Sequence, residues 1–220
     1  MIESGLYPIS VTNRSFTSAN VLATLKALGA LAPRSMTFLV ADALHAYNRG
    51  IDHASEDVVS VFSEPNAVVE KRRWMRNVVG RARREGIVRQ AEVKGIDEVT
   101  DRWTLHTLRN LDVAFVRDPR FRSDVEAVAE DYCRRRTRPG TPCRDLSVRY
   151  VLEELAISTK LKFVDRITAE YYMGEVFKCT RRLFAGEYAF RARDLVGQSR
   201  EVDVRLFSFS WETGRWFPVV

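Results

Sequence analysis

A hydroxyl, a phenol and a carboxylate in this chain have positions that favour one shared pocket. Ser10 follows the apolar run Leu6-Tyr7-Pro8-Ile9, which puts its hydroxyl at the carboxyl end of a first strand. Open α/β sheets keep their chemistry at that edge. Further along the chain, Tyr150 and Glu154 have the i, i+4 spacing that sets both side chains on one side of a helix. Together the three groups are typical of nucleophilic and acid–base chemistry.

Length and composition indicate a single domain, residues 1 to 220. A chain of 220 residues is long enough for a full hydrophobic core and short for two domains. Hydrophobic residues make up 45% and charged residues 29%, as in soluble globular proteins. The apolar runs fall far short of the roughly 20 residues of a membrane helix, and no secretory leader is visible. We therefore expect a cytoplasmic protein that does not bind a membrane.

The cysteines and histidines predict neither a disulfide framework nor a metal site. Cys133, Cys143 and Cys179 have no CxxC spacing and leave one cysteine unpaired in any disulfide scheme. A reducing, cytoplasmic compartment is the simplest interpretation. The three histidines are scattered as well, so no zinc site is expected.

Short apolar runs alternate with longer helical patterns, which predicts an α/β fold with a parallel sheet flanked by helices. Strands are expected at residues 6–10, 36–40 and 163–172, and helices at 17–29, 43–49, 65–85, 95–110, 121–135, 145–157 and 174–184. Residues 111–116 fit either a strand or a continuation of the preceding helix. The tail, 202–220, alternates apolar and polar residues around Glu212-Thr213-Gly214-Arg215, which suggests a terminal hairpin.

Positive charge is concentrated on one predicted helix. The chain carries a net charge of +6, and seven basic residues but no acidic one stand between Lys71 and Arg84. On a helix, three of the arginines fall within about 40° of one another. The basic face comprises Lys71, Arg72, Arg73, Arg76, Arg83 and Arg84. The neighbouring face carries Val68, Met75, Val78, Val79 and Ala82. We expect this helix to pack on the core and present guanidinium groups to phosphates; a solvated charged face is the alternative.

Four segments, in this order, resemble the cyclodipeptide synthases. They are Ile9 to Phe16, Tyr150 to Glu154, the basic helix near 71–84, and Glu170-Tyr171-Tyr172. The resemblance spans roughly residues 5 to 190. It implies a Rossmann-like domain similar to the catalytic domains of class I tyrosyl- and tryptophanyl-tRNA synthetases. Asn13, three residues after the serine, is similar to the branch of the family that keeps an asparagine there.

The resemblance implies catalytic roles for the matching polar residues. Ser10 is the nucleophile that takes the first aminoacyl group, and Asn13 belongs to the same segment. Tyr150 and Glu154 hold the α-amino group, because a carboxylate orients an ammonium at short range. A tyrosine at the end of a late strand assists proton transfer, and Tyr171 is favoured over Tyr172 for this role.

The resemblance also implies a pocket for the first amino acid. Its residues are Leu6, Pro8, Ile157 and Ala169, which favour a hydrophobic or aromatic side chain. Pro8 stands where many relatives have a glycine, a departure that affects the shape of this pocket.

The implied substrates are two aminoacyl-tRNAs, which the family joins into a diketopiperazine by ping-pong acyl transfer. Because an aminoacyl ester is already activated, no ATP, metal or other cofactor is needed. The basic helix would bind the tRNA through its phosphates. A tailoring enzyme that acts on the product is a further partner in this scheme.

Two other classes of function remain open at this stage. A serine hydrolase would need a base near Ser10 and usually a G-x-S-x-G elbow, and the segment around Ser10 lacks both glycines. A non-enzymatic RNA-binding domain would use the basic helix alone, with Ser10 as an ordinary helix N-cap. Such a domain needs aromatic residues among the basic ones, and this helix offers Trp74 alone.

Overall fold

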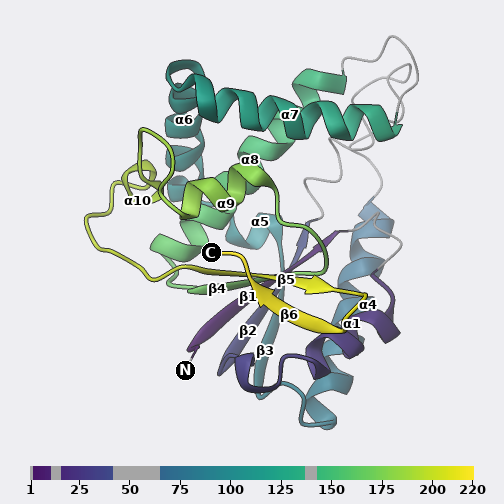
Figure 1. Cartoon of the computed structure of the whole chain (residues 1–220). Helices are drawn as coiled ribbons and strands as arrows, with labels where there is room; N and C mark the ends of the chain where they lie inside the picture. Colours follow the sequence, from purple (N-terminus) through teal and green to yellow (C-terminus); the bar gives the residue numbers. More distant parts are fainter. Residues whose placement is uncertain (1, 11–15, 42–64, 137–142) are drawn as a thin grey trace.

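The structure is a computed structural model that describes all residues except 1, 11–15, 42–64 and 137–142 (Figure 1). Six strands of the described chain form one sheet in the order β3-β2-β1-β4-β5-β6. The strands are β1 (Ser4–Ser10), β2 (Ser35–Ala41), β3 (Gln90–Gly95), β4 (Ala169–Tyr172), β5 (Arg205–Ser210) and β6 (Arg215–Pro218). The first five are parallel, and β6 is antiparallel to β5. The predicted α/β fold, a single Rossmann-like domain, is confirmed.

Helices cover both faces of the sheet (Figure 1). On one face lie α1 (Ser18–Lys26) and α4 (Pro65–Arg84). The helices on the other face are α5 (Ile96–Val99), α6 (Arg102–Arg117), α7 (Pro119–Arg136), α8 (Cys143–Phe163), α9 (Lys178–Phe184) and α10 (Ala192–Leu195). None of the described helices combines the length and apolar character needed to cross a bilayer.

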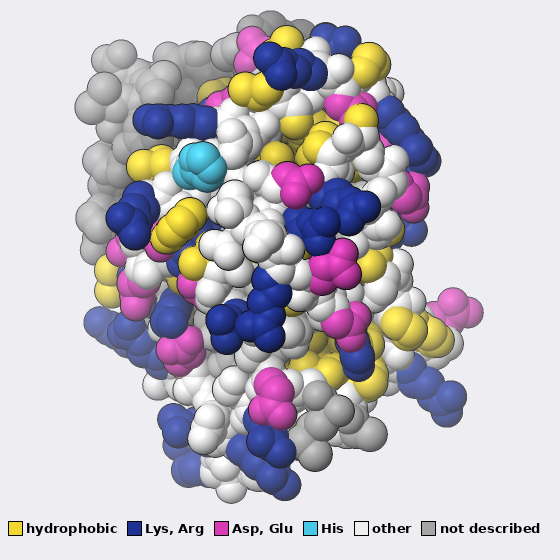
Figure 2. Space-filling view, turned by 90° about the vertical axis from the view of Figure 1, so that its left-hand side faces the viewer, with side chains coloured by type: hydrophobic (Ala, Val, Ile, Leu, Met, Phe, Trp, Pro, Cys, Tyr) yellow, Lys and Arg dark blue, Asp and Glu magenta, His cyan; other side chains and the backbone are white. Residues whose placement is uncertain are grey.

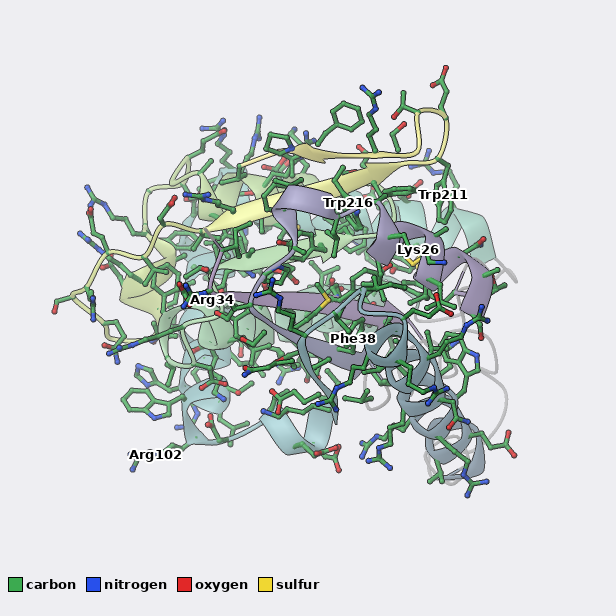
Figure 3. The ribbon with its side chains drawn as sticks, turned by 90° about the horizontal axis from the view of Figure 1, so that it is seen from below. Lys26, Arg34, Phe38, Arg102, Trp211 and Trp216 are labelled. Carbon is green, nitrogen blue, oxygen red and sulfur yellow. A yellow bond between two sulfur atoms is a disulfide. The ribbon has the colours of Figure 1, made fainter. Side chains whose placement is uncertain are left out.

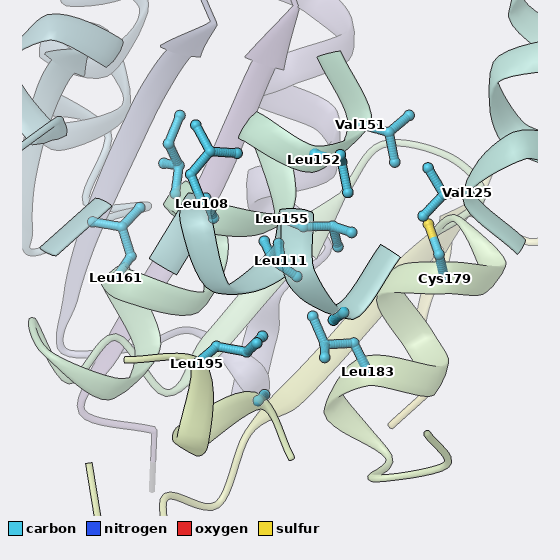
Figure 4. Close-up of a cluster of buried hydrophobic side chains, with 14 of the residues drawn as sticks. Leu108, Leu111, Val125, Val151, Leu152, Leu155, Leu161, Cys179, Leu183 and Leu195 are labelled. Carbon is cyan, nitrogen blue, oxygen red and sulfur yellow. The ribbon is translucent and has the colours of Figure 1, made fainter. Parts of the chain in front are cut away.

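Alternation along the central strands fills two apolar layers. Leu6 and Leu39 belong to the layer under α6, α7 and α8, whereas Tyr7 and Phe38 belong to the layer under α1 and α4. Figure 4 shows the first layer, in which leucines of α6, α8 and α9 gather in one cluster. Because β1 and β2 are covered on both sides, they read in the sequence as continuous apolar runs.

Several predicted boundaries differ from the structure. Residues 111–116 continue α6, and the helix expected at 95–110 is divided because Asp101 caps α6 by accepting bonds from the amides of Trp103 and Thr104. The strand predicted at 163–172 is wrong over most of its length, since α8 continues to Phe163 and β4 begins at Ala169. Strand β3 was not predicted. The helix expected at 43–49 lies outside the described residues.

The carboxyl-terminal hairpin extends the sheet beyond β4. It consists of β5 and β6, and Trp216 on β6 packs edge-on against Tyr7, with ring centroids 6.2 Å apart. The indole Nε1 of Trp216 donates to the backbone oxygen of Thr24 in α1 at 2.9 Å, and the Tyr7 hydroxyl bonds Thr24 Oγ1 at 2.5 Å. Figure 3 shows Trp216 at this junction with the α1 layer. The tail therefore holds α1 against the sheet.

Two cysteines that were expected to be unpaired are joined. A disulfide links Cys133 near the end of α7 to Cys143 at the start of α8, while Cys179 is a buried free thiol. The packing of α7 against α8 brings the two cysteines together, with Cα atoms 5.7 Å apart. The spacing of ten residues carries no signal for this contact.

Tyr171 is a core residue of the α1 layer. It is fully buried, its ring stacks on Phe207 with centroids 5.1 Å apart, and its hydroxyl donates to the Leu31 backbone oxygen at 2.7 Å. The ring also lies against Gly5, where an added Cβ would come within 2.7 Å of it. The contacts of Tyr171 with Phe207, Leu31 and Gly5 therefore make it a packing residue of the core.

We expect Tyr171→Ala to lower the free energy of unfolding by about 3 to 5 kcal/mol, because a large buried ring is replaced by a cavity. Urea unfolding followed by circular dichroism measures the change. Tyr172→Ala, one residue along the same strand, is the matched control and should cost less, since Tyr172 is only partly buried. Equal losses at the two positions would contradict this assignment.

Candidate active site

A cavity of about 530 Å³ lies at the carboxyl ends of β1 and β4. The strand order reverses between these two strands, because β1 is followed along the sheet by β2 on one side and β4 by β5 on the other. Ligands of open α/β sheets bind at such a reversal. Strand β4 pairs with β1 only at Gly5 and Leu6, so Pro8 lies beyond the last residue paired with β4, although it is still in register with Leu39 of β2.

The wall formed by β1 and β2 is apolar, and Ile157 of α8 adds to it. Leu6, Pro8 and Ile157 line the cavity, so three of the four residues predicted for the substrate pocket are brought together there. Ala169 is not among them; it is buried in the α1 layer on the other side of the sheet. Strand β4 alternates, and the side chains that it presents to the cavity are Glu170 and Tyr172.

The same alternation separates the two candidate tyrosines. Tyr171 shares the face of Ala169 and is directed away from the cavity, whereas Tyr172 lines it. The structure therefore brings Tyr172, and not the preferred Tyr171, to the cavity. Choosing between adjacent tyrosines requires the register of β4, which a count along the sequence does not supply.

Ser10 is the last residue of β1 and is in register with Ala41 of β2, which lines the cavity. Its side chain and the whole of Asn13 lie outside the described residues. The following helix, α1, is capped by Thr17, whose hydroxyl accepts from the amide of Asn20 at 3.2 Å. The described N-cap of α1 is thus another residue, which removes the reason to assign that role to Ser10.

Helix α8 carries a row of four polar side chains at four-residue spacing. They are Tyr150, Glu154, Ser158 and Lys162. Residues at this spacing share one side of a helix, and the row faces Glu170 and Tyr172 of β4. The sequence pattern predicted the first two members, and the structure places both at the cavity.

Glu154 is a buried carboxyl group whose pKa is shifted by its surroundings. Burial, followed by the nearby charge of Glu170, raises its pKa to about 7, against the opposing effects of a hydrogen bond to Tyr150 and the charge of Lys162. Its Oε2 atom is buried and accepts no hydrogen bond from the described chain. Burial likewise raises the pKa of Tyr150 well above its ordinary value. Glu154 thus has an unused acceptor beside a phenol that stays protonated.

A second carboxyl group, Glu170, receives two donors on its Oε2 atom. It accepts from Lys162 Nζ and, at 2.8 Å, from Ser158 Oγ. Lys162 Nζ also donates to Ser158 Oγ at 2.6 Å and lies 4.4 Å from the centre of the Phe184 ring. Burial lowers the pKa of Lys162, an effect that the adjacent Glu170 opposes, and burial raises the pKa of Tyr172.

Ser158 and Lys162 were not predicted as functional residues, and Glu170 entered only as part of the segment Glu170-Tyr171-Tyr172. A signal for the first two exists. The four-residue spacing that singles out Tyr150 and Glu154 continues to Ser158 and Lys162, which places charged and polar groups on the same side of a helix with few exposed positions. The described residues contain no group of histidine, cysteine and carboxylate side chains able to hold a metal ion.

Some basic residues of α4 form ion pairs within the described chain, and others do not. Arg73, Arg76, Arg83 and Arg84 are exposed and have no ion pair within the described chain, while Met75, Val78, Val79 and Ala82 are buried as expected. Figure 2 shows another face of the molecule, on which basic and acidic side chains are interspersed. The free arginines of α4 therefore form an exposed basic surface.

Arg72 and Lys71 do not belong to that surface. Arg72 pairs with Asp97 and, at 3.3 Å, with Glu98 of α5, so its charge is already neutralised. Lys71 donates to the backbone oxygen of Phe16 at 3.3 Å and lies over the Trp74 ring at 4.0 Å. Burial lowers its pKa. Both residues instead fix α4 beside the cavity, which Phe16 also lines.

The raised pKa of Glu154 makes a prediction about stability. A carboxyl group with a pKa of about 7 in the folded protein and 4.5 as its ordinary value stabilises the fold fully below about pH 4.5, and this contribution is lost as the pH rises to 7. Glu154→Gln cannot ionise. It should therefore gain about 3 kcal/mol of stability relative to the wild type between pH 4.5 and pH 8.

Urea unfolding of the wild type and Glu154→Gln across this pH range measures the difference. The exposed Glu130→Gln on α7 is the matched control and should follow the wild type. Parallel stability curves for the wild type and Glu154→Gln would show that Glu154 is not perturbed.

Comparison by sequence gives no relative: no family model and no curated protein matches the chain. Solved structures do match it by shape. A CDPS from Fluoribacter dumoffii is 18% identical with a TM-score of 0.72, over 94% of this chain and 88% of that one. A cyclodipeptide synthase from Streptomyces noursei is 15% identical with a TM-score of 0.64, over 96% and 97%.

A third match connects the fold with a larger group. It is a Mycobacterium tuberculosis protein described as demonstrating that cyclodipeptide synthetases are related to type I tRNA synthetases; it is 12% identical with a TM-score of 0.58, over 79% of this chain and 74% of that one. At these identities the likeness concerns the fold. This chain therefore has the fold of the cyclodipeptide synthases, with its cavity at the strand reversal of that fold.

Proposed function

We propose that the chain is a tRNA-dependent cyclodipeptide synthase that joins two aminoacyl groups into a diketopiperazine. The observation that carries the proposal is the buried Tyr150–Glu154 pair, whose carboxylate has an unused acceptor, inside the strand-reversal cavity of a fold shared with cyclodipeptide synthases. A buried carboxylate of this kind suits an ammonium group, which every aminoacyl ester carries.

The first step is attack by Ser10 on the ester of an aminoacyl-tRNA. A bond forms between Ser10 Oγ and the carbonyl carbon, the bond to the ribose oxygen breaks, and that oxygen leaves with the proton of the serine. The position of Ser10 supports this role, since it ends β1 two residues after Pro8 and four after Leu6, both of which line the cavity. Glu154 and Tyr150 hold the α-ammonium while the acyl group is transferred.

The second step needs the amine of the bound residue in its neutral form. A carboxylate with a pKa of about 7 is suited to take that proton near neutral pH. The amine then attacks the ester of a second aminoacyl-tRNA, which releases the second tRNA and leaves a dipeptide on Ser10. Attack of the new terminal amine on the seryl ester closes the ring and frees the serine. Tyr172, on the cavity wall, relays protons in these later steps.

The reaction needs no cofactor because its substrates are activated esters. The free arginines of α4 bind the tRNA backbone, whose phosphates contribute affinity without sequence readout. Charged tRNAs as substrates imply a cytoplasmic protein. The apolar wall of Leu6, Pro8 and Ile157 favours a hydrophobic or aromatic first residue.

Incubation with a pool of charged tRNAs, followed by mass spectrometry, tests the proposal. We expect diketopiperazine in solution and an aminoacyl adduct on Ser10, and both should be lost in Ser10→Ala because the attacking Oγ atom is removed. Ser123→Ala, an exposed serine on α7, is the control and should keep both. Diketopiperazine made by Ser10→Ala would defeat the covalent scheme, and a protein that binds tRNA without adduct or product would be an RNA-binding domain.

The role of α4 predicts a change in salt dependence. In Arg76→Ala/Arg83→Ala, the slope of log affinity for tRNA against log salt concentration should fall in magnitude by about one per arginine, because each phosphate contact releases counterions. Fluorescence anisotropy with labelled tRNA measures the slope. Arg34→Ala, an exposed arginine on another part of the surface (Figure 3), should leave it unchanged. An unchanged slope in the double variant would place the tRNA elsewhere.

A further inference from the structure

Lys162 is a buried cation that the proposed chemistry does not use. Its side chain is fully buried on α8, where it contacts Ser158, Glu170 and the ring of Phe184. An unpaired ammonium in such a place is very costly, so the lysine is tolerated because Glu170 neutralises it. Apolar residues at both positions could fill the same space, so packing alone does not explain why a charged pair stands there.

The carboxyl groups of Glu154 and Glu170 outnumber the one ammonium group that the described chain places beside them, that of Lys162. Both carboxyl groups face this cation, and the charge of Glu170 raises the pKa of Glu154. Lys162 and Ser158 both donate to the same oxygen of Glu170, whereas Glu154 Oε2 has no donor. When both carboxyls are ionised, the surplus negative charge therefore rests on Glu154, beside the cavity.

We propose that Lys162 is a positioning residue, which neutralises Glu170 and thereby fixes the free negative charge of the cavity on Glu154. That this charge receives an α-ammonium rests on the function proposed above. Lys162 does not line the cavity, so it acts through the two carboxylates and not on the substrate.

The need for the lysine follows from the competition between the two carboxyl groups. Without Lys162, two carboxylates in one buried site would share a proton, as like charges at short range do. The charge of Lys162 is one of the effects that lower the pKa of Glu154, so its loss would leave the repulsion from Glu170 unopposed and favour the protonated form of Glu154. A protonated Glu154 cannot pair with an ammonium.

Several other titratable groups face Glu154, and none supplies the missing positive charge. They are Tyr150 from α8, Tyr172 from β4 and Cys179 from α9. Burial raises the pKa of each, so all three stay neutral in the range where Glu154 ionises. Among the described groups whose charge shifts the pKa of Glu154, Lys162 is therefore the cation.

Titration of Glu154 by ¹³C NMR of glutamate-labelled protein tests the proposal without any substrate, and Glu154→Gln assigns the signal. In Lys162→Met we expect Glu154 to titrate about one pH unit or more above the wild type. In Lys162→Met/Glu170→Gln it should return to the wild-type value or below, because the charge of Glu170 affects Glu154 more strongly than that of Lys162 does. If Lys162 were only structural, adding Glu170→Gln to Lys162→Met would not restore the titration of Glu154.

The rate of Ser10 acylation by an aminoacyl ester, measured against pH, provides the second readout. The pH below which this rate falls should be higher in Lys162→Met than in the wild type, and it should return to the wild-type value in the double variant. Failure of the wild type to form the adduct would overturn the proposed function, while the NMR titration would still decide the role of Lys162. An unmoved Glu154 titration in Lys162→Met would overturn the role of Lys162.

Should Lys162→Met fail to fold, Glu170→Gln serves in its place. There the titration of Glu154 should move below that of the wild type, since a repelling charge is removed and Lys162 remains. A titration of Glu154 in Glu170→Gln that matches the wild type would overturn the proposal.

Discussion

Burial of charge between α8 and β4 constrains the rest of this structure. Lys162 and Glu170 lie in the core, and each is tolerated because the other is within bonding distance. The pair also sets the register of β4. A slip of one residue would move Glu170 into the apolar layer that now holds Ala169 and Tyr171, leave Lys162 without a partner, and bring the Tyr171 ring into the cavity. The register that satisfies the ion pair is thus the register that places Tyr172 at the site.

The position of the cavity follows from how the chain crosses the sheet. Helix α1 follows β1 on one face, whereas α8 precedes β4 on the other, and the two strands pair only near their amino ends. Beyond Leu6 they have no paired residues, and the space above their carboxyl ends is bounded by α7, α8 and the segment after β4. Pro8, which would weaken a fully paired central strand, stands where the pairing with β4 has ended.

Much of the fold could be predicted from local patterns, and the parts that could not depend on distant contacts. Strands β1 and β2 and the start of α4 at Pro65 follow from buried apolar runs and from the helix-starting tendency of proline. Strand β3 could not be predicted, because its Glu92 and Lys94 suit an edge whose partner is known only after folding. Arg72 reads as part of the basic surface, yet Asp97 and Glu98 of α5 neutralise it. Pairings of this kind depend on elements that meet only in three dimensions.

The distribution of charge matches the charge of the proposed substrate. An aminoacyl-tRNA is a polyanion with one ammonium at its tip. Helix α4, 20 residues and so about 30 Å long, carries free arginines from Arg73 to Arg84, and Lys71 ties the helix to Phe16 at the cavity. The surplus carboxylate, Glu154, lies inside that cavity. A basic surface that leads to an acidic pocket would repel the phosphates from the catalytic groups and attract the ammonium, so one electrostatic arrangement orients both ends of the substrate.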